Sequence, residues 1–364
     1  MSVKLVVVAG ARPNFMKVAP LIAAFAADDL IPILVHTGQH YDYAMSGQFF
    51  HDLGLPAPHY HLEAGSGSHA QQTAEILKRM EPVLLNEQPA GVVVVGDVNS
   101  TIAGALAASK LGIAVVHVEA GLRSFDRSMP EEINRLATDA ITDLFLVTEE
   151  SGRRNLLREG VQAERIHMIG NLMIDSLRKH LEHALGSDIR RRLIAEERYG
   201  LVTLHRPANV DHEGRLAEIL GALTKISEEV PLYWPVHPRT RLKLAASASL
   251  SRNIHLLDPL GYLDFLSLEA QSAVVLTDSG GIQEETTVLG VPCLTIRENT
   301  ERPVTIECGT NLLAGTSRES ILKAWRESVD RPKTGRVPPL WDGKAGERAS
   351  AVLRKYFRGS PDSH

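Results

Sequence analysis

The sequence predicts an α/β protein made of two doubly wound domains, each with a parallel sheet covered by helices on both faces. Three observations support this prediction. Short runs of β-branched residues alternate with amphipathic stretches along the whole chain. The strand-like runs are apolar throughout, as in parallel sheets that are buried on both faces. The length of 364 residues exceeds what one hydrophobic core ordinarily supports.

The first half alternates strand-like runs with helix-like stretches. Its predicted strands are residues 4–8, 32–36, 91–95, 114–118 and 143–147. The helices predicted between them include residues 15–27, 71–86, 101–111 and 131–142. Strands that alternate with helices are typical of a parallel sheet with helical crossovers. The first domain is therefore predicted to span residues 1–172.

The second half repeats the pattern and is predicted to form a domain of residues 173–344. Its predicted strands are residues 200–204, 232–235, 254–257, 273–277 and 292–295, and its helices include 213–229, 262–271 and 281–289. The final helical pattern, residues 345–358, is expected to pack back on the first domain. Ligands of open α/β sheets bind at the carboxyl ends of the strands. We therefore expect the two domains to face a common cleft.

Composition limits the classes of partner. The net charge of -5 and the isoelectric point of about 6.3 provide no basic surface for nucleic acid. The apolar run at residues 6–9 is too short for a signal-peptide core, and no apolar stretch approaches the ~20 residues that cross a bilayer. Cys293 and Cys308 lack metal-site spacing and form no disulfide framework. We expect a cytoplasmic protein without a membrane partner.

The turn after the first strand carries cations. Gly10 to Asn14 contains one glycine, so it is not the glycine-rich fingerprint of a dinucleotide fold. Arg12 and Lys17, at the start of the following helix, suit a diphosphate instead. The alternative is that both are solvated charges on a first helical turn.

The strongest local signal is the segment 277–285, Thr-Asp-Ser-Gly-Gly-Ile-Gln-Glu-Glu. A strand ends at Thr277 and a helix is predicted to begin at Ser279 or Gly280. The free N–H groups there, which Gly280 and Gly281 leave open, and the Ser279 hydroxyl would hold phosphate oxygens. Glu285 lies within reach of a ribose, and Arg302 after the next strand adds a cation. The alternative is a tight turn capped by Asp278 or Ser279.

Carboxylates form a second constellation. Asp97 and Glu119 end neighbouring predicted strands, and Glu131 opens a helix close behind them. Acidic groups gathered around one cleft raise each other's pKa values, which separates acid from base roles. A metal site formed by His117 and Glu119 is a rival, although no third ligand has diagnostic spacing. Structural ion pairs are the other alternative, with the neighbouring Arg123, Arg127 and Arg135.

Three further candidates lie in the second half. His205 ends the first strand of that half, where it is a candidate for catalysis or phosphate contact. His237 ends the next strand and is a candidate substrate contact. Phe265 could stack on a base, although the alternative is a place in the core.

Taken together, these motifs resemble the non-hydrolysing UDP-N-acetylglucosamine 2-epimerases. The resemblance runs from Val6 to about Gly315 and rests on seven segments in order. They are residues 10–17 (GARPNFMK), 37–40 (TGQH), 96–97 (GD), 117–123 (HVEAGLR), 130–135 (PEEINR), 277–285 (TDSGGIQEE) and 300–303 (TERP).

The resemblance implies two Rossmann-like domains of the glycosyltransferase-B type, a homodimer, and a nucleotide held in the interdomain cleft. Asp97, Glu119, Glu131 and His205 fall on family catalytic positions. Phe265 falls on the position that stacks on uracil. The positions that contact UDP are matched by Arg12, Lys17, Ser279, Glu285 and Arg302.

The sequence departs from well-known members at Tyr41-Asp42, at Val304, and at Pro207 to Asn209 after His205-Arg206. The first departure lies in a region that the family ties to activation by a second substrate molecule. The exact sugar, N-acetylglucosamine or a modified relative such as a diacetamido uronic acid, stays open.

The implied reaction needs no cofactor and no metal. A base removes the C2 proton as the bond from C1 to UDP breaks, and UDP then adds back with a proton on the opposite face. This route requires acid and base groups and a firm hold on the diphosphate. The alternatives are a glycosyltransferase, a hydrolysing epimerase, and a catalytically silent sensor of nucleotide sugars.

Overall fold

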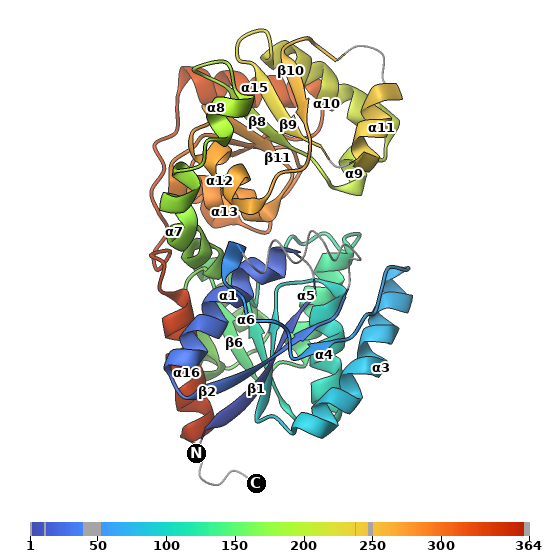
Figure 1. The fold of residues 1–364 in the computed structure, drawn as a ribbon, viewed down its shortest axis with the longest axis vertical. Helices are drawn as coiled ribbons and strands as arrows, with labels where there is room; N and C mark the ends of the chain where they lie inside the picture. Colours follow the sequence, from blue (N-terminus) through green and yellow to red (C-terminus); the bar gives the residue numbers. More distant parts are fainter. Residues whose placement is uncertain (1, 11, 39–51, 237, 247–249, 360–364) are drawn as a thin grey trace. The chain divides into compact units, whose positions relative to one another are not determined.

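The computed structural model describes residues 2–10, 12–38, 52–236, 238–246 and 250–359. The chain divides into two compact units (Figure 1). Unit 1 comprises Met1–Ser176 and Pro339–His364, and unit 2 comprises Leu177–Pro338. The break between the units and the predicted boundary at residues 172 and 173 both fall in one helix, α7 (Leu172–Leu185).

The sheet of unit 1 has the strand order β3-β2-β1-β4-β5-β6-β7, and every neighbouring pair of strands is parallel. Its strands are β1 (Val3–Ala9), β2 (Leu30–His36), β3 (Tyr60–His61), β4 (Gly91–Val95), β5 (Ala114–Val118), β6 (Leu144–Val147) and β7 (Ile166–Met168). The central strands are buried along almost their whole length, as strands covered on both faces must be.

Helices cover both faces of this sheet. They are α1 (Arg12–Ala27), α3 (His69–Glu87), α4 (Asn99–Lys110), α5 (Pro130–Ala140), α6 (Glu150–Arg158), α16 (Ala345–Arg358) and the first turn of α7, with a short 3-10 helix at Ala163–Arg165. The last helix, α16, packs beside α1 (Figure 1). On the other face, α3 and α4 pack together over Val6, Val8 and Val94.

Unit 2 repeats the architecture with the order β10-β9-β8-β11-β12-β13, again parallel throughout. Its strands are β8 (Gly200–Thr203), β9 (Leu232–Pro235), β10 (Ile254–Leu257), β11 (Val274–Thr277), β12 (Cys293–Thr295) and β13 (Asn311–Leu313). Its helices are the rest of α7, α8 (Ile189–Leu193), α9 (Pro207–Val210), α10 (Glu213–Ile226), α11 (Pro238–Ala246), α12 (Tyr262–Ala270), α13 (Gly280–Leu289), α14 (Pro303–Glu307) and α15 (Arg318–Asp330).

Two apolar clusters fill the faces of the second sheet. One joins Trp234 and the strand interiors to α10 and α15 through Leu223 and Trp325. The other lies under α8, α12 and α13 and includes Tyr199 and Leu268. Each unit thus has its own core, and the predicted pair of doubly wound parallel α/β domains is confirmed. Among the described residues, no helix is both long and apolar enough to cross a membrane.

The strand order of each sheet shows its switch point, where the chain reverses the direction in which it adds strands. In unit 1 the chain winds outward in opposite directions from β1 and β4. In unit 2 it does so from β8 and β11. Ligands of doubly wound folds bind at the carboxyl ends of the strands on either side of such a point. The residues that follow these four strands are therefore the ones to inspect.

Candidate active site

Asp97 lies at the switch point of unit 1, directly after β4. Its carboxylate forms an ion pair with Arg135 of α5, and its side chain is 26% exposed. The Asp97 backbone carbonyl accepts a hydrogen bond of 2.9 Å from the side-chain amide of Asn134. Two adjacent residues of α5, Asn134 and Arg135, thus hold the backbone and the side chain of Asp97.

Glu119 follows β5, the strand next to β4, and lies beside the turn that carries Asp97. Its backbone is left-handed, with φ of 72°, a conformation that side-chain-bearing residues seldom adopt. Its carboxylate is 5% exposed and forms an ion pair with Lys17 of α1. A Cβ built on Gly96 would lie 3.7 Å from both the Glu119 carboxylate and the Lys17 ammonium. The structure thus brings Lys17, Glu119 and the Asp97 turn together at the carboxyl ends of the central strands.

Glu131 lies half-buried in the first turn of α5, four positions before the arginine that pairs with Asp97. Residues four apart share one face of a helix, so Glu131 is on the side of α5 that carries Arg135. The adjacent Glu132 is buried and structural. It pairs with Arg135 at 2.7 Å and accepts hydrogen bonds from the backbone N–H groups of Ser124 and Phe125 at 2.9 and 3.0 Å.

His117 is fully buried, and protein groups contact both of its ring nitrogens. Nε2 lies 2.8 Å from the Gly96 carbonyl and Nδ1 lies 2.6 Å from Asp139. Burial opposes the ionisation of Asp139, but His117 and Arg123 outweigh it and hold the pKa of this carboxyl below its ordinary value. These contacts occupy His117, so it does not share a metal with Glu119 as the rival interpretation required. No metal-binding cluster of three His, Cys, Asp or Glu residues occurs in the described parts of the chain.

Asp278 organises the switch point of unit 2. This fully buried carboxylate accepts hydrogen bonds from the backbone N–H groups of His205 and Arg206 at 3.1 and 3.0 Å and from the Asn209 amide at 3.0 Å. Burial alone would raise its pKa, but His205, Arg206 and Asn209 together lower it. The His205 ring contacts the same carboxylate at 3.0 Å while its side chain remains 61% exposed. Asp278 thus orients the ring of His205, and the rest of this predicted site residue stays exposed to solvent.

Helix α13 begins at Gly280, as predicted, with Ser279 as its N-cap residue. No side chain of the described residues caps it with a hydrogen bond, since Asp278 is turned toward residues 205–209. The N–H groups at this end therefore suit an anion. A Cβ on Gly280 would lie 2.9 Å from the Glu301 carboxylate, so glycine keeps this turn open. Gly281 continues the first turn.

Arg302 is buried and forms an ion pair with Glu284 of α13 at 2.5 Å. Its predicted role in binding UDP stays a prediction. Arg206, which is less buried, donates to the Asp278 backbone carbonyl at 2.9 Å and lies 3.7 Å from Glu301. Phe265 packs against the core cluster under α12, and its stacking on a base stays a prediction.

Glu285 is buried with Glu269 beneath the start of α13. Tyr262 donates a hydrogen bond of 3.1 Å to Glu285. Burial raises the pKa of Glu285 to about 8, and burial together with the charge of Glu285 raises the pKa of Glu269 well above its ordinary value. Both carboxyls are therefore favoured in their neutral form. Contact between Glu285 and a ribose stays a prediction.

The raised pKa values of Glu269 and Glu285 predict that the free energy of unfolding falls as pH rises. A folded state with raised carboxyl pKa values binds more protons than the unfolded chain from pH 4.5 to about 8. The free energy of unfolding should decline there by up to about 1.4 kcal/mol per pH unit through Glu285, and Glu269 acts in the same direction. Glu269→Gln should flatten this decline in denaturant unfolding measured from pH 5 to 9. Glu319→Gln, on the exposed side of α15, is the control. An unchanged slope in Glu269→Gln would contradict the prediction.

Some predicted residues lie outside what the structure describes. His237 and residues 39–42 are not described, and for Arg12, which begins α1, no side chain is described. Their roles stay predictions.

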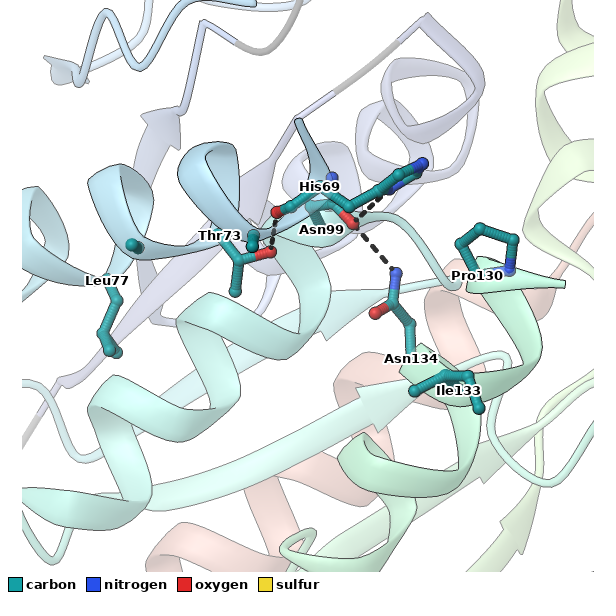
Figure 2. Close-up of a pocket in the computed structure, with 9 residues that line it drawn as sticks. His69, Thr73, Leu77, Asn99, Pro130, Ile133 and Asn134 are labelled. Carbon is teal, nitrogen blue, oxygen red and sulfur yellow. Dashed lines mark hydrogen bonds between the residues drawn. The ribbon is translucent and has the colours of Figure 1, made fainter. Parts of the chain in front are cut away.

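A separate pocket lies between α3 and α5 of unit 1. Figure 2 shows His69 and Asn134 converging on the side-chain oxygen of Asn99, at 3.2 and 3.3 Å. The other side chains that line it are largely apolar and include Leu77 and Ile133. The same Asn134 amide holds the Asp97 carbonyl. Asn134 therefore links the side chains of this pocket to the turn that carries Asp97.

The family model for UDP-N-acetylglucosamine 2-epimerase matches residues 23–354. The chain belongs to the UDP-N-acetylglucosamine 2-epimerase family. Members of this family are isomerases, and the resemblance drawn from the sequence motifs is confirmed.

Two relatives illustrate the range of this epimerase family. The UDP-N-acetylglucosamine 2-epimerase of Methanocaldococcus jannaschii is 42% identical over 361 residues, covering 96% of this chain and 98% of the relative. The UDP-2,3-diacetamido-2,3-dideoxy-D-glucuronate 2-epimerase of Pseudomonas aeruginosa is 40% identical over 356 residues, covering 97% and 99%. A crystal structure of the M. jannaschii enzyme in complex with UDP-GlcNAc and UDP matches with a TM-score of 0.89 over 96% of this chain and 99% of that one.

Proposed function

We propose that this chain inverts C2 of a UDP-2-acetamido sugar and converts UDP-N-acetylglucosamine to UDP-N-acetylmannosamine without hydrolysis. The observation that carries the proposal is the placement of two carboxylates, Asp97 and Glu119, on the neighbouring turns after β4 and β5. Membership of the epimerase family supports the choice of reaction.

The C2 proton has no adjacent carbonyl group, so direct deprotonation is difficult. Elimination avoids this difficulty. A carboxylate takes the C2 proton, the C1–O bond breaks, and its electron pair leaves with UDP, giving a 2-acetamidoglucal. In the return step UDP adds to C1 while a second acid delivers a proton to the other face of C2. Asp97, Glu119 and Glu131 share these proton transfers in the proposal.

Unit 2 supplies the hold on UDP. The open N-terminus of α13, with Ser279, Gly280 and Gly281, suits the diphosphate. His205 is positioned by Asp278 and exposed, which suits contact with a developing negative charge. By resemblance, Arg12 and Lys17 reach the diphosphate from the first domain, Glu285 contacts the ribose, Phe265 stacks on uracil, and His237 and Arg302 complete the set.

A modified sugar is the second candidate substrate. The 40% identity to a 2-epimerase of a diacetamido glucuronate favours testing it. Both candidates share the acetamido group at C2 and the UDP leaving group, so the same proton transfers serve both.

Proton NMR in D2O tests the proposal. Purified protein is incubated with UDP-N-acetylglucosamine and EDTA, without an acceptor or NAD. Growth of the manno epimer with deuterium at C2 and UDP still attached is the expected result. Free N-acetylmannosamine would indicate a hydrolysing epimerase. An unchanged spectrum with this sugar and with the diacetamido uronate would favour a transferase or a sensor.

We further propose that the protein is a cytoplasmic homodimer that supplies cell-surface polysaccharide synthesis and binds no nucleic acid. The family resemblance supports the dimer, and the net charge of -5 supports the absence of nucleic acid. Exposed apolar side chains of unit 1, such as Leu85 of α3 and Ile133 of α5, are available for contact with a second copy. Light scattering after size-exclusion chromatography is expected to give twice the chain mass.

A further inference from the structure

Side chains hold three successive backbone carbonyls at the end of β4 and in the turn after it. The Val95 carbonyl accepts from the Asn14 amide at 3.0 Å and the Thr101 hydroxyl at 2.8 Å. The Gly96 carbonyl accepts from His117 at 2.8 Å, and the Asp97 carbonyl accepts from Asn134. The donors come from α1, α4, β5 and α5. This turn is thus fixed from several sides just where it presents Asp97.

His117 differs from the other donors because it is also connected, through Asp139, to the turn that carries Glu119. Its Nδ1 contacts one carboxylate oxygen of Asp139 at 2.6 Å, and the other oxygen accepts the Gly121 backbone N–H at 3.0 Å. A continuous path of hydrogen bonds therefore runs from Gly96 through His117 and Asp139 to Gly121. It joins the turn of Asp97 to the turn of Glu119.

Each member of this path is held by close polar contacts. The Gly96 carbonyl can only accept, so Nε2 of His117 carries a hydrogen. Asp139 also pairs with Arg123 at 2.7 Å, and Arg123 in turn pairs with Glu159 at 2.7 Å. Charge-assisted hydrogen bonds are short and directional, so the path is stiff.

We propose that His117 and Asp139 are positioning residues that set the spacing between Asp97 and Glu119. The inference rests on the proposed epimerase function. Both residues are buried, and they act through Gly96 and Gly121 without touching the substrate. Two proton-transfer groups that serve opposite faces of C2 must both be in register with the same carbon, and a misplacement of about 1 Å can cost 10²-fold in rate.

The experiment compares wild type with His117→Gln and Asp139→Asn. We expect kcat for epimerisation to fall about 100-fold, while the affinity for UDP alone changes less than about twofold because neither residue is among the proposed UDP contacts. The fraction of turnovers that end as free UDP and 2-acetamidoglucal should rise, because the return proton arrives late. Glu159→Gln, which removes only the outer partner of Arg123, is the matched control and should behave as wild type.

The product fraction does not depend on how much of the protein is folded, so it separates positioning from a loss of stability. Unchanged fractions in both variants, with kcat reduced only in proportion to the folded protein, would overturn the inference. A crystal structure of Asp139→Asn gives a readout without activity, since the separation of Asp97 and Glu119 should change. If wild type itself exchanges no C2 proton with either candidate sugar, the proposed function fails instead.

Discussion

Asp97→Asn is expected to lower kcat for epimerisation by about 10² to 10⁴-fold, the range that one general acid or base contributes. The amide keeps the size of the side chain and removes its capacity to take a proton. The affinity for UDP should stay close to that of wild type, because Asp97 is not among the residues proposed to contact UDP. Deuterium incorporation at C2 and UDP titration together measure both effects.

Glu150→Gln is the control for Asp97→Asn, because Glu150 is an exposed carboxylate on α6 of the same unit. If Asp97→Asn exchanged the C2 hydrogen at the wild-type rate, Asp97 would not belong to the residues that transfer protons. If Asp97→Asn lost this exchange but still transferred the sugar from UDP to an acceptor, the result would favour the alternative function of a glycosyltransferase.

Gly121→Ala is expected to destabilise unit 1 by roughly 3 kcal/mol or more, the sum of a left-handed backbone and an overpacked contact. Gly121 has φ of 77°, and a Cβ there would lie 2.3 Å from the Gly152 carbonyl oxygen and 2.8 Å from Leu156. The backbone of α6 approaches too closely for the added methyl group. Denaturant unfolding measures the loss.

Gly160→Ala separates the two causes. Gly160 has φ of 88°, and a Cβ there meets no described atom within 4 Å. Its replacement should cost only the backbone strain, about 1 to 2 kcal/mol. Equal losses in the two variants would contradict the clash at Gly121.

The sequence predicted the fold from its strongest patterns. The long β-branched runs of β1, β4 and β5 are largely apolar, which identified buried parallel strands. The edge strands β3, β7 and β13 were missed because two or three residues carry no readable period. A strand that short depends on its neighbour for pairing, and the neighbour is known only from the folded chain.

The site was predictable where a residue follows a strand. This rule selected Asp97 after β4, Glu119 after β5 and His205 after β8. It could not separate adjacent carboxylates such as Glu131 and Glu132, since the packing of a helix decides which one turns inward. For the same reason Asp139 and Asp278, which orient the functional turns from within, carried no distinguishing signal in the sequence.

The left-handed backbone of Glu119 has a consequence for how this position should vary among copies of the gene. Glycine and asparagine accept this conformation more readily than glutamate does, so glutamate at this turn goes against the local preference of the backbone. A copy released from catalysis has no reason to keep it. If Glu119 serves the proposed proton transfer, copies of this gene that have lost the reaction are expected to drift at this single codon to residues that the turn prefers, while working copies keep the acid.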